Sequence, residues 1–346
     1  MKKRLLFPLI ASVFALSGCV IKFGDFILFG IEDGELIVFG TVKEEEQTPV
    51  YVVDTTVVDK HYTNYDLNKT GGRLVLELQK YMFDKHTKWI SYGQVNSYYS
   101  KGSTRNSIEA IADGSPVNEW YYTGKELKGT GGSNREHVWA CANSSGLWTH
   151  TKPAAGSFSA HYVDNSSYIG GGSDLYHVRL CEANVNTARG NSRFVSFDDP
   201  EWSEYKNSVL EYGENNGKYN IKLYNYQTTS TGGIEYANQA EPDDHFKGDV
   251  ARLILYVWIH YTERDITPEG SVKSGSYTFE YSDMTGSLSL SDIMGYDSEA
   301  RCLEVIKSWC KIDPPSSVEK LRNDTVQKIQ GNRNPFVDYP NLVDQL

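Results

Sequence analysis

The sequence predicts an α+β fold, in which short strands and longer helices follow one another along 346 residues. Two observations predict it. Some segments carry apolar residues at the three- and four-residue spacing of a helix, and others are short β-branched and aromatic runs bounded by turn residues. The chain is long enough to bury one large core or two modest ones. Its 39% hydrophobic and 23% charged residues are ordinary for a soluble globular protein.

The first residues have the pattern of a bacterial export signal. Lys2, Lys3 and Arg4 form a basic start, and residues 5–16 are apolar but too few to span a bilayer. The sequence Leu-Ser-Gly-Cys ending at Cys19 is similar to a lipobox, in which the cysteine is acylated and becomes the mature N-terminus. An ordinary cleaved signal is the alternative. We therefore expect an extracellular protein that is anchored to a membrane by lipid on Cys19.

The next segment predicts a small N-terminal unit. Residues 20–42 contain two short apolar runs separated by an Asp-Gly turn, which is the pattern of short strands. Residues 44–49 are acidic, end in proline and resemble a linker. The expected organisation is a signal peptide, an anchor segment with short strands and an acidic linker, and a main domain, at residues 1–18, 19–64 and 65–346.

Three later segments have helical spacing. Residues 72–87 place Leu74 and Leu78 on one side, and residues 246–263 carry the longest apolar stripe. A further helix is expected over residues 298–311, before two consecutive prolines. On the flank of the second helix, Asp249 and Arg252 are three residues apart and are ready partners for an ion pair. These helices are expected to pack around the strands of the main domain.

The charge of the chain restricts how it can meet a polyanion. The formal net charge is −11, and removing residues 1–18 takes away three positive charges and no acids, giving −14. Such acidity argues against a protein that coats nucleic acid electrostatically, since phosphate binding normally relies on Lys and Arg. It does not exclude an enzyme with a local basic patch and a bound cation.

Three polar stretches are candidates for a catalytic site, at residues 134–139, 174–179 and 182–191. Hydrolysis of a phosphodiester needs a deprotonated water, a cation that takes up developing charge, and in-line geometry. His137 is the candidate base, because histidine accepts a proton near neutral pH. Glu136 and Asn186 offer the oxygen ligands that hard cations prefer.

The expected local structure places these residues around one phosphate. Successive residues of a strand point to opposite faces, so Glu136 and His137 can lie on opposite sides of the reacting group. The third stretch is interpreted as a helix that begins just after Cys181. Asn186, Arg189 and Arg193 would then share one face by their i, i+3 and i+7 spacing.

These stretches resemble the bacterial endonuclease I family. Its members carry a ββα-metal (His-Me finger) nuclease core packed among helices, with Glu-His on the first part and Val-Asn-x-x-Arg-x-Asn on the helix. Residues 72–98, 247–252 and 332–338 resemble further family stretches in the same order. The resemblance covers residues 65–346.

The resemblance implies a role for each site residue. Glu136 and Asn186 bind a divalent cation, expected to be Mg²⁺ with Ca²⁺ or Mn²⁺ as alternatives, and His137 activates water. Arg179 and Arg189 are further catalytic candidates that contact phosphate, although salt bridges to nearby carboxylates compete with that role. The implied activity is cleavage of DNA, and also RNA, with little sequence preference, leaving 5′-phosphates. The protein is expected to be a monomer.

Two departures from the family pattern bear on substrate preference. Ala140 stands where members usually have proline, and the segment over residues 140–173 is longer than usual. His177 either lines the site or is a buried histidine that holds the hairpin by hydrogen bonds. The alternative function is a catalytically weak, surface-anchored adhesin or nucleic-acid-binding protein on a nuclease fold.

Four cysteines follow Cys19, and the sequence allows both disulfides and free thiols among them. Cys302 and Cys310 would lie about 12 Å apart in an unbroken helix, too far to bridge. Cys141 and Cys181 each lie four residues beyond a histidine, so we expect a bridge between them at the base of the hairpin, contributing about 3–4 kcal/mol. A Cys₂His₂ zinc site from the same two repeats is disfavoured, because four residues of strand span about 13 Å.

Overall fold

The computed structural model divides the chain into two compact units, Met1–Thr55 and Thr56–Leu346. The residues that it describes are 21–23, 26–32, 35–37, 60–98, 120–125, 133–143, 170–213, 218–228, 230, 234–262, 271–274, 277–280 and 288–346. The signal sequence, Cys19 and the acidic linker lie outside the described residues. All three candidate stretches belong to the second unit.

The first unit contains a three-stranded antiparallel sheet in the order β1-β2-β3. Its strands are β1 (Ile21–Phe23), β2 (Phe26–Glu32) and β3 (Glu35–Ile37). The central strand β2 pairs with both neighbours, and the Asp-Gly pair lies between β2 and β3. The short strands expected over residues 20–42 are thus confirmed.

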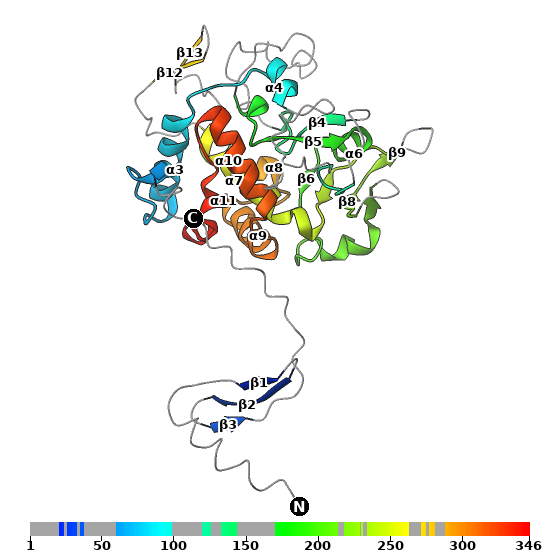
Figure 1. Cartoon of the computed structure of the whole chain (residues 1–346). Helices are drawn as coiled ribbons and strands as arrows, with labels where there is room; N and C mark the ends of the chain where they lie inside the picture. The colour runs from blue at the N-terminus through cyan, green and yellow to red at the C-terminus, as the bar shows by residue number, and fades with distance from the viewer. Residues whose placement is uncertain are drawn as a thin grey trace, which may run out of the picture. The chain divides into compact units, whose positions relative to one another are not determined.

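The second unit mixes helices and strands, as an α+β fold requires (Figure 1). Its described helices are α3 (Gly71–Lys85), α4 (Tyr92–Tyr98), α6 (Ala183–Arg189), α7 (Asp244–Tyr261), α8 (Leu290–Ile293), α9 (Glu299–Ile312), α10 (Ser317–Gln330) and α11 (Pro335–Asp338), with 3₁₀ turns η3 (Gly171–Ser173), η4 (Ser203–Ser208) and η6 (Pro340–Gln345). Its described strands are β4 (Ser133–His137), β5 (Val178–Glu182), β6 (Arg193–Phe194), β7 (Leu210–Tyr212), β8 (Ile221–Tyr224), β9 (Gln227–Thr228), β10 (Ile234–Tyr236), β11 (Gln239–Glu241), β12 (Ser271–Ser274) and β13 (Tyr277–Glu280).

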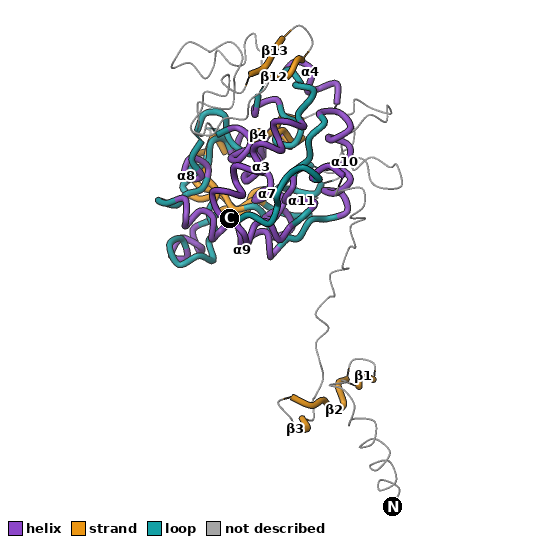
Figure 2. The backbone as a smooth tube through the Cα atoms, turned by 90° about the vertical axis from the view of Figure 1, so that its left-hand side faces the viewer, coloured by secondary structure: helices purple, strands orange, loops and turns teal. Residues whose placement is uncertain are grey.

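Helix α7 forms the centre of this unit. It packs against α3, α9 and α11, which Figures 1 and 2 place around it. The sequence predicted one apolar stripe, but every residue from Val250 to Tyr261 is buried, so α7 is covered on all sides. The side chain of Asp243 accepts a hydrogen bond from the amide of His245 and caps the helix start.

The other predicted helices are confirmed with small shifts of their ends. Helix α3 buries Leu74 and Leu78 as its spacing predicts. Helix α9 begins after Ser298, whose hydroxyl caps it, and ends before the two prolines. Both Cys302 and Cys310 lie buried in α9 and are unbridged, as the helical geometry requires.

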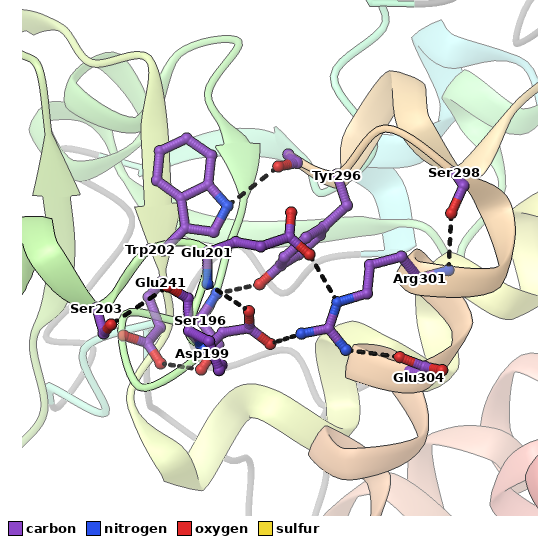
Figure 3. Close-up of polar contacts among 12 residues, drawn as sticks. Ser196, Asp199, Glu201, Trp202, Ser203, Glu241, Tyr296, Ser298, Arg301 and Glu304 are labelled. Atoms are coloured by element: carbon purple, nitrogen blue, oxygen red, sulfur yellow. Dashed lines mark hydrogen bonds and ion pairs between the residues drawn. The ribbon is translucent and has the colours of Figure 1, made fainter.

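A four-stranded sheet in the order β6-β11-β8-β7 follows the candidate stretches in the sequence. The loop that follows β6 is fastened to α9 by Arg301, whose guanidinium contacts Asp199, Glu201 and Glu304 (Figure 3). The indole Nε1–H of Trp202 donates to the carbonyl of Gly295 at 3.1 Å. Because Arg301 contacts all three carboxylates, it holds the loop after β6 against α9, and these contacts stabilise the fold.

Among the described helices, none combines the length and apolar character that crossing a membrane requires.

Candidate active site

An antiparallel hairpin of β4 and β5 carries the first two candidate stretches. Glu136 lies opposite Arg179 and His137 lies opposite Val178. Helix α6 begins at Ala183, directly after β5, and packs against both strands. The three stretches therefore form one β-β-α unit, in which neighbouring residues of β4 face opposite sides.

Glu136 points toward α6 and is almost completely buried, with 1% of its surface exposed. Its Oε1 accepts a hydrogen bond from the Tyr122 hydroxyl at 2.8 Å and lies 3.2 Å from Nη1 of Arg189. Within the described part of the chain, both contacts of this carboxylate fall on Oε1. Burial raises the pKa of Glu136 above its ordinary value, while Arg189 and the Tyr122 hydroxyl act against that rise.

His137 points to the other side of β4, toward the 3₁₀ turn η3. Its Nε2 lies 2.8 Å from the carbonyl oxygen of Gly172. A carbonyl only accepts, so Nε2 carries the proton and Nδ1 is the basic nitrogen of the neutral ring. Burial lowers the pKa of His137 to about 4, although the Gly172 carbonyl favours the charged form. The ring is therefore neutral, and able to accept a proton, throughout the physiological pH range.

His177 is a structural histidine in this arrangement. Its Nδ1 lies 2.7 Å from the carbonyl of Gly171, and its Nε2 accepts the backbone N–H of Trp139 at 2.9 Å. Both ring nitrogens are thus used within the fold, and the side chain is fully buried. Of the two interpretations the sequence left open, the structure favours the one in which His177 holds the end of β4.

Asn186 and Arg189 share one face of α6, as their spacing predicts, and Asn186 is half-buried. Arg189 contacts Glu136 from this face, so Asn186 lies one turn before it on the side that faces the hairpin. The expectation for Arg193 was wrong. Gly190, with φ 51°, ends the helix, and Arg193 lies exposed in β6.

The two arginines predicted to contact phosphate are both engaged inside the protein. Arg189 has 1% of its surface exposed and donates to the carbonyls of His137 and Val138 as well as contacting Glu136. Arg179 forms an ion pair with Asp249 and lies over the ring of Tyr121, 4.6 Å from its centroid. Each arginine has the salt bridge that the sequence suggested as the competing role.

The expected pairing of Arg252 with Asp249 was wrong. Arg252 donates to Glu319 with both Nε and Nη2, at 2.7 and 2.6 Å, and Asp249 pairs with Arg179 instead. Residues three apart on a helix compete with partners from other elements, and here helix α10 supplies the nearer carboxylate for a buried guanidinium.

The disulfide expected between Cys141 and Cys181 is absent, and none of the four described cysteines forms a disulfide. The strand register explains why. Cys181 lies opposite Asn134, near the start of β4, whereas Cys141 follows the far end of that strand. The same register and the two occupied nitrogens of His177 rule out the zinc site drawn from these residues.

Two partners of the site were missed from the sequence. Tyr122, which donates to Glu136, has φ 72°, a left-handed backbone conformation that is rare for a large side chain. No local pattern indicates such a residue. Gly172 had a readable signal, because three consecutive glycines precede Ser173 and glycine runs permit close backbone approach.

One further group of metal-ligand types lies among the described residues, and all three members are buried. Ligand atoms of His86, Asp174 and His260 lie within 4.8 Å of one another. The sequence did not single out this cluster. Nδ1 of His86 lies 2.9 Å from Nε2 of His260, so the two rings share a hydrogen bond.

The fold and site define a class of protein: an α+β nuclease whose acidic and histidine residues are neighbours on one strand and face a short helix. The chain belongs to the endonuclease I family, whose profile matches residues 70–341. It is 30% identical over 306 residues to an extracellular ribonuclease of Bacillus amyloliquefaciens, covering 87% of this chain and 82% of that protein. It is 31% identical over 225 residues to an extracellular ribonuclease of Bacillus subtilis (strain 168), covering 64% of this chain and 57% of the relative. The protein is accordingly a nuclease, a hydrolase of phosphodiester bonds.

Proposed function

We propose that this protein is a divalent-metal-dependent endonuclease that cleaves DNA and RNA outside the cell with little sequence preference. The observation that carries the proposal is the hydrogen bond between Nε2 of His137 and the Gly172 carbonyl. It fixes the tautomer in which Nδ1 can accept a proton, and it does so beside a buried acid and a helix that carries an amide ligand.

His137 acts as the general base in this proposal. Its lowered pKa, about 4, keeps the imidazole neutral at neutral pH, and the attacking water gives its proton to Nδ1. The Gly172 carbonyl holds the opposite nitrogen and stabilises the ring once it becomes positively charged. This division of roles needs no second histidine, consistent with the structural use of both nitrogens of His177.

Glu136 and Asn186 are the residues that would hold the divalent cation. The donor set fits a hard cation, because it offers a carboxylate and an amide oxygen, and the described contacts of Glu136 leave Oε2 for a ligand. When bound, such a cation supplies charge stabilisation for the phosphate oxygens and the leaving oxygen. We expect Mg²⁺ to serve, with Ca²⁺ or Mn²⁺ as alternatives.

Arg189 and Arg179 are assigned different parts. Arg189 lowers the pKa of Glu136 against the rise that burial causes, and it ties Glu136 to the backbone at the end of β4, so it acts on the reaction through Glu136. Arg179 reaches a substrate phosphate only if it exchanges Asp249 for that phosphate, which is a charge-conserving replacement. Both remain part of the proposed catalytic machinery.

The proposed chemistry does not depend on the sugar. A base that activates an external water leaves the 2′-hydroxyl of RNA without a role, so the same site can cut DNA and RNA and leave 5′-phosphates. The two relatives named as extracellular ribonucleases support RNA as a substrate and secretion as a route. The signal-like start and Cys19 support attachment of this nuclease to a membrane surface by lipid.

The proposal is tested by assaying the full chain and its His137→Ala variant on plasmid DNA and on a long RNA, with and without a chelator. Loss of a general base should reduce cleavage of both substrates by about 10²- to 10⁴-fold. His245→Ala is the matched control, since His245 is exposed at the start of α7. Variant activity within a factor of a few of the parent would refute the assignment, and binding without cleavage by the parent would favour an adhesin instead.

A further inference from the structure

Asp174 is a buried carboxylate that accepts four hydrogen bonds. Its Oδ2 accepts the hydroxyls of Tyr256 and Tyr261, at 2.7 and 2.6 Å. Its Oδ1 accepts the backbone N–H of Tyr176 at 2.7 Å and the Nε2–H of Gln330 at 3.0 Å. Only 2% of its surface is exposed. Since a carboxylate offers about four lone-pair positions, this group is saturated by the protein.

These donors fasten Asp174 to the centre of the fold. Tyr256 and Tyr261 belong to the buried helix α7, and Gln330 ends α10. Such charge-assisted hydrogen bonds are short and directional, and removing one leaves a buried group without its partner. The backbone at Asp174 therefore has little freedom to move.

Asp174 directly follows the turn η3, whose carbonyls orient the site histidines. The Gly172 carbonyl holds Nε2 of His137, and the Gly171 carbonyl holds His177, which in turn binds the N–H of Trp139. On its other side the turn is tied down by the Ser173 hydroxyl, which donates to the carbonyl of Ile90 at 2.7 Å. Any shift of Asp174 would thus be passed to both histidines.

We propose that Asp174 is a positioning residue for His137, and that Tyr256, Tyr261 and Gln330 extend this role into the core. Through η3 the four hydrogen bonds set the place of the Gly172 carbonyl, and so the tautomer and orientation of the catalytic ring. The inference rests on the proposed function of His137 as general base. It adds residues of α7 and α10 to the machinery, although none of them touches substrate.

The histidines beside Asp174 fit this interpretation better than they fit a metal site. A cation would need a lone pair from Asp174, His86 and His260, but the four donors occupy the carboxylate and the two rings bond to each other at 2.9 Å. Burial lowers the pKa of both histidines to about 3, so the pair is neutral and adds no charge beneath Asp174. It fills the space between α3 and α7 with a polar but uncharged contact.

The test compares two substitutions of the same chemistry. Tyr261→Phe removes one hydroxyl from Asp174, and Tyr62→Phe removes a buried hydroxyl that donates to Asp338 at 2.7 Å, away from η3. We expect Tyr261→Phe to lower kcat by about 10-fold with KM unchanged, and Asp174→Asn by about 100-fold, because small displacements of a reacting group have effects of this size. Tyr62→Phe should change kcat by less than about 2-fold at a similar loss of melting temperature. Equal kcat values in Tyr261→Phe and Tyr62→Phe would overturn the proposal.

A second readout does not depend on activity. In protein labelled with ¹⁵N-histidine, the His137 signals, identified with a His137→Gln variant, should report a proton on Nε2 in the parent and in Tyr62→Phe. They should show a mixture of tautomers in Tyr261→Phe and Asp174→Asn. If the parent cleaves nothing but these shifts occur, the proposed function fails while the positioning role stands. Unchanged His137 signals overturn the positioning role, as does one zinc per purified chain that is lost in both Asp174→Asn and His260→Gln.

Discussion

Two arginine–glutamate pairs of this protein are both buried but differently built. Arg189 and Arg252 each expose 1% of their surface. Arg252 contacts both oxygens of Glu319 through two parallel hydrogen bonds. Arg189 contacts only Oε1 of Glu136, at 3.2 Å, and its Nη1 and Nη2 also donate to backbone carbonyls.

The difference distinguishes the Arg252 pair, which holds two helices together, from the Arg189 pair of the proposed site. Both pairs lose hydration on burial, and a bidentate pair compensates that loss most completely. The Arg252 pair is closed and fixes α7 to α10. The Arg189 pair is open, since it leaves Oε2 of Glu136 outside the ion pair, where the proposed function uses it as a ligand for a cation.

The largest expected effects come from replacing Glu136 and Glu319, one at a time, by glutamine. Glu136→Gln should lower cleavage by about 10²-fold or more, because it removes a proposed ligand. Its loss of stability should be smaller than that of Glu319→Gln, because Arg189 still donates to the backbone carbonyls of His137 and Val138. Glu319→Gln should lower the free energy of unfolding by about 3–5 kcal/mol, because it leaves Arg252 buried without a charged partner. Urea unfolding and plasmid cleavage of both variants measure the two effects.

If Glu136→Gln lowered mainly stability and Glu319→Gln lowered mainly cleavage, the open pair would hold the fold and the closed pair would not. In that case Glu136→Gln would unfold at markedly lower urea, and folded Glu319→Gln would lose activity.

Lowering the pH tests, without a mutation, whether burial keeps His137 and the other buried histidines neutral. Burial lowers the pKa of His137 to about 4 and of His177, His86 and His260 to about 3. Below pH 6.5 the unfolded chain binds protons at these histidines that the folded chain does not, so their contribution is complete above 6.5 and is lost as pH falls. Each contributes up to about 1.4 kcal/mol per pH unit in this window.

We therefore expect the free energy of unfolding to fall steeply between pH 6.5 and 4, measured by urea titration at half-unit steps. Cleavage that follows the folded fraction should continue to about pH 5, because His137 remains a base there. Stability that is constant from pH 7 to 5 would mean that these histidines are not held neutral by burial.

A smaller effect is expected at the second proposed ligand of the open pair. Asn186→Ala should raise the Mg²⁺ concentration needed for half-maximal cleavage by about 10-fold, equivalent to about 1.4 kcal/mol. Activity should then return at high Mg²⁺, since mass action refills a weakened site. The variant Lys311→Ala, at an exposed position of α9, is the control and should keep the titration of the parent. Coinciding curves for Asn186→Ala and the parent would remove Asn186 from the site.

The smallest effect concerns salt. Arginines that stay in internal pairs release few counterions, so Arg179 and Arg189 should add little to the salt dependence of DNA binding, whereas exposed Arg193 can add about −0.9 to the slope of log affinity against log salt. Binding of His137→Ala to duplex DNA from about 50 to 200 mM salt should give a slope no steeper than about −3. Arg193→Ala should flatten it by about 0.9. A slope beyond −6 would require a broad basic surface on a chain of net charge −11.

The sequence predicted those parts of the fold that local pattern determines. Helical spacing located α3, α7 and α9, and the Cys181 to Asn191 stretch located α6 within a few residues. The neighbours Glu136 and His137 were expected on opposite faces of a strand, and β4 places them so. The family pattern tied these segments into one nuclease unit.

Side-chain partners contributed by segments far apart in the sequence could not be predicted from local pattern. The competition between Asp249 and Glu319 for Arg252 is decided by how α10 packs, and the pairing of Arg179 with Asp249 follows from it. The hydroxyl on Glu136 comes from Tyr122, whose left-handed backbone has no signature in a single sequence. The stop of α6 at Gly190 was readable, because glycine commonly ends a helix, and it was overlooked.

The hairpin register also bears on how this protein can change in evolution. The chain between Asn143 and Gly170 leaves and re-enters the site at the same end of the β4–β5 pair, and both of its ends are fastened by hydrogen bonds, to Asn191 and to Ser173. Its length therefore does not alter which residue of β4 faces which of β5. Doubling the length of such a connection raises the free energy of loop closure by only about 0.6 kcal/mol. A change in the length of this connection would therefore leave the proposed catalytic neighbours, Glu136 and His137, in place.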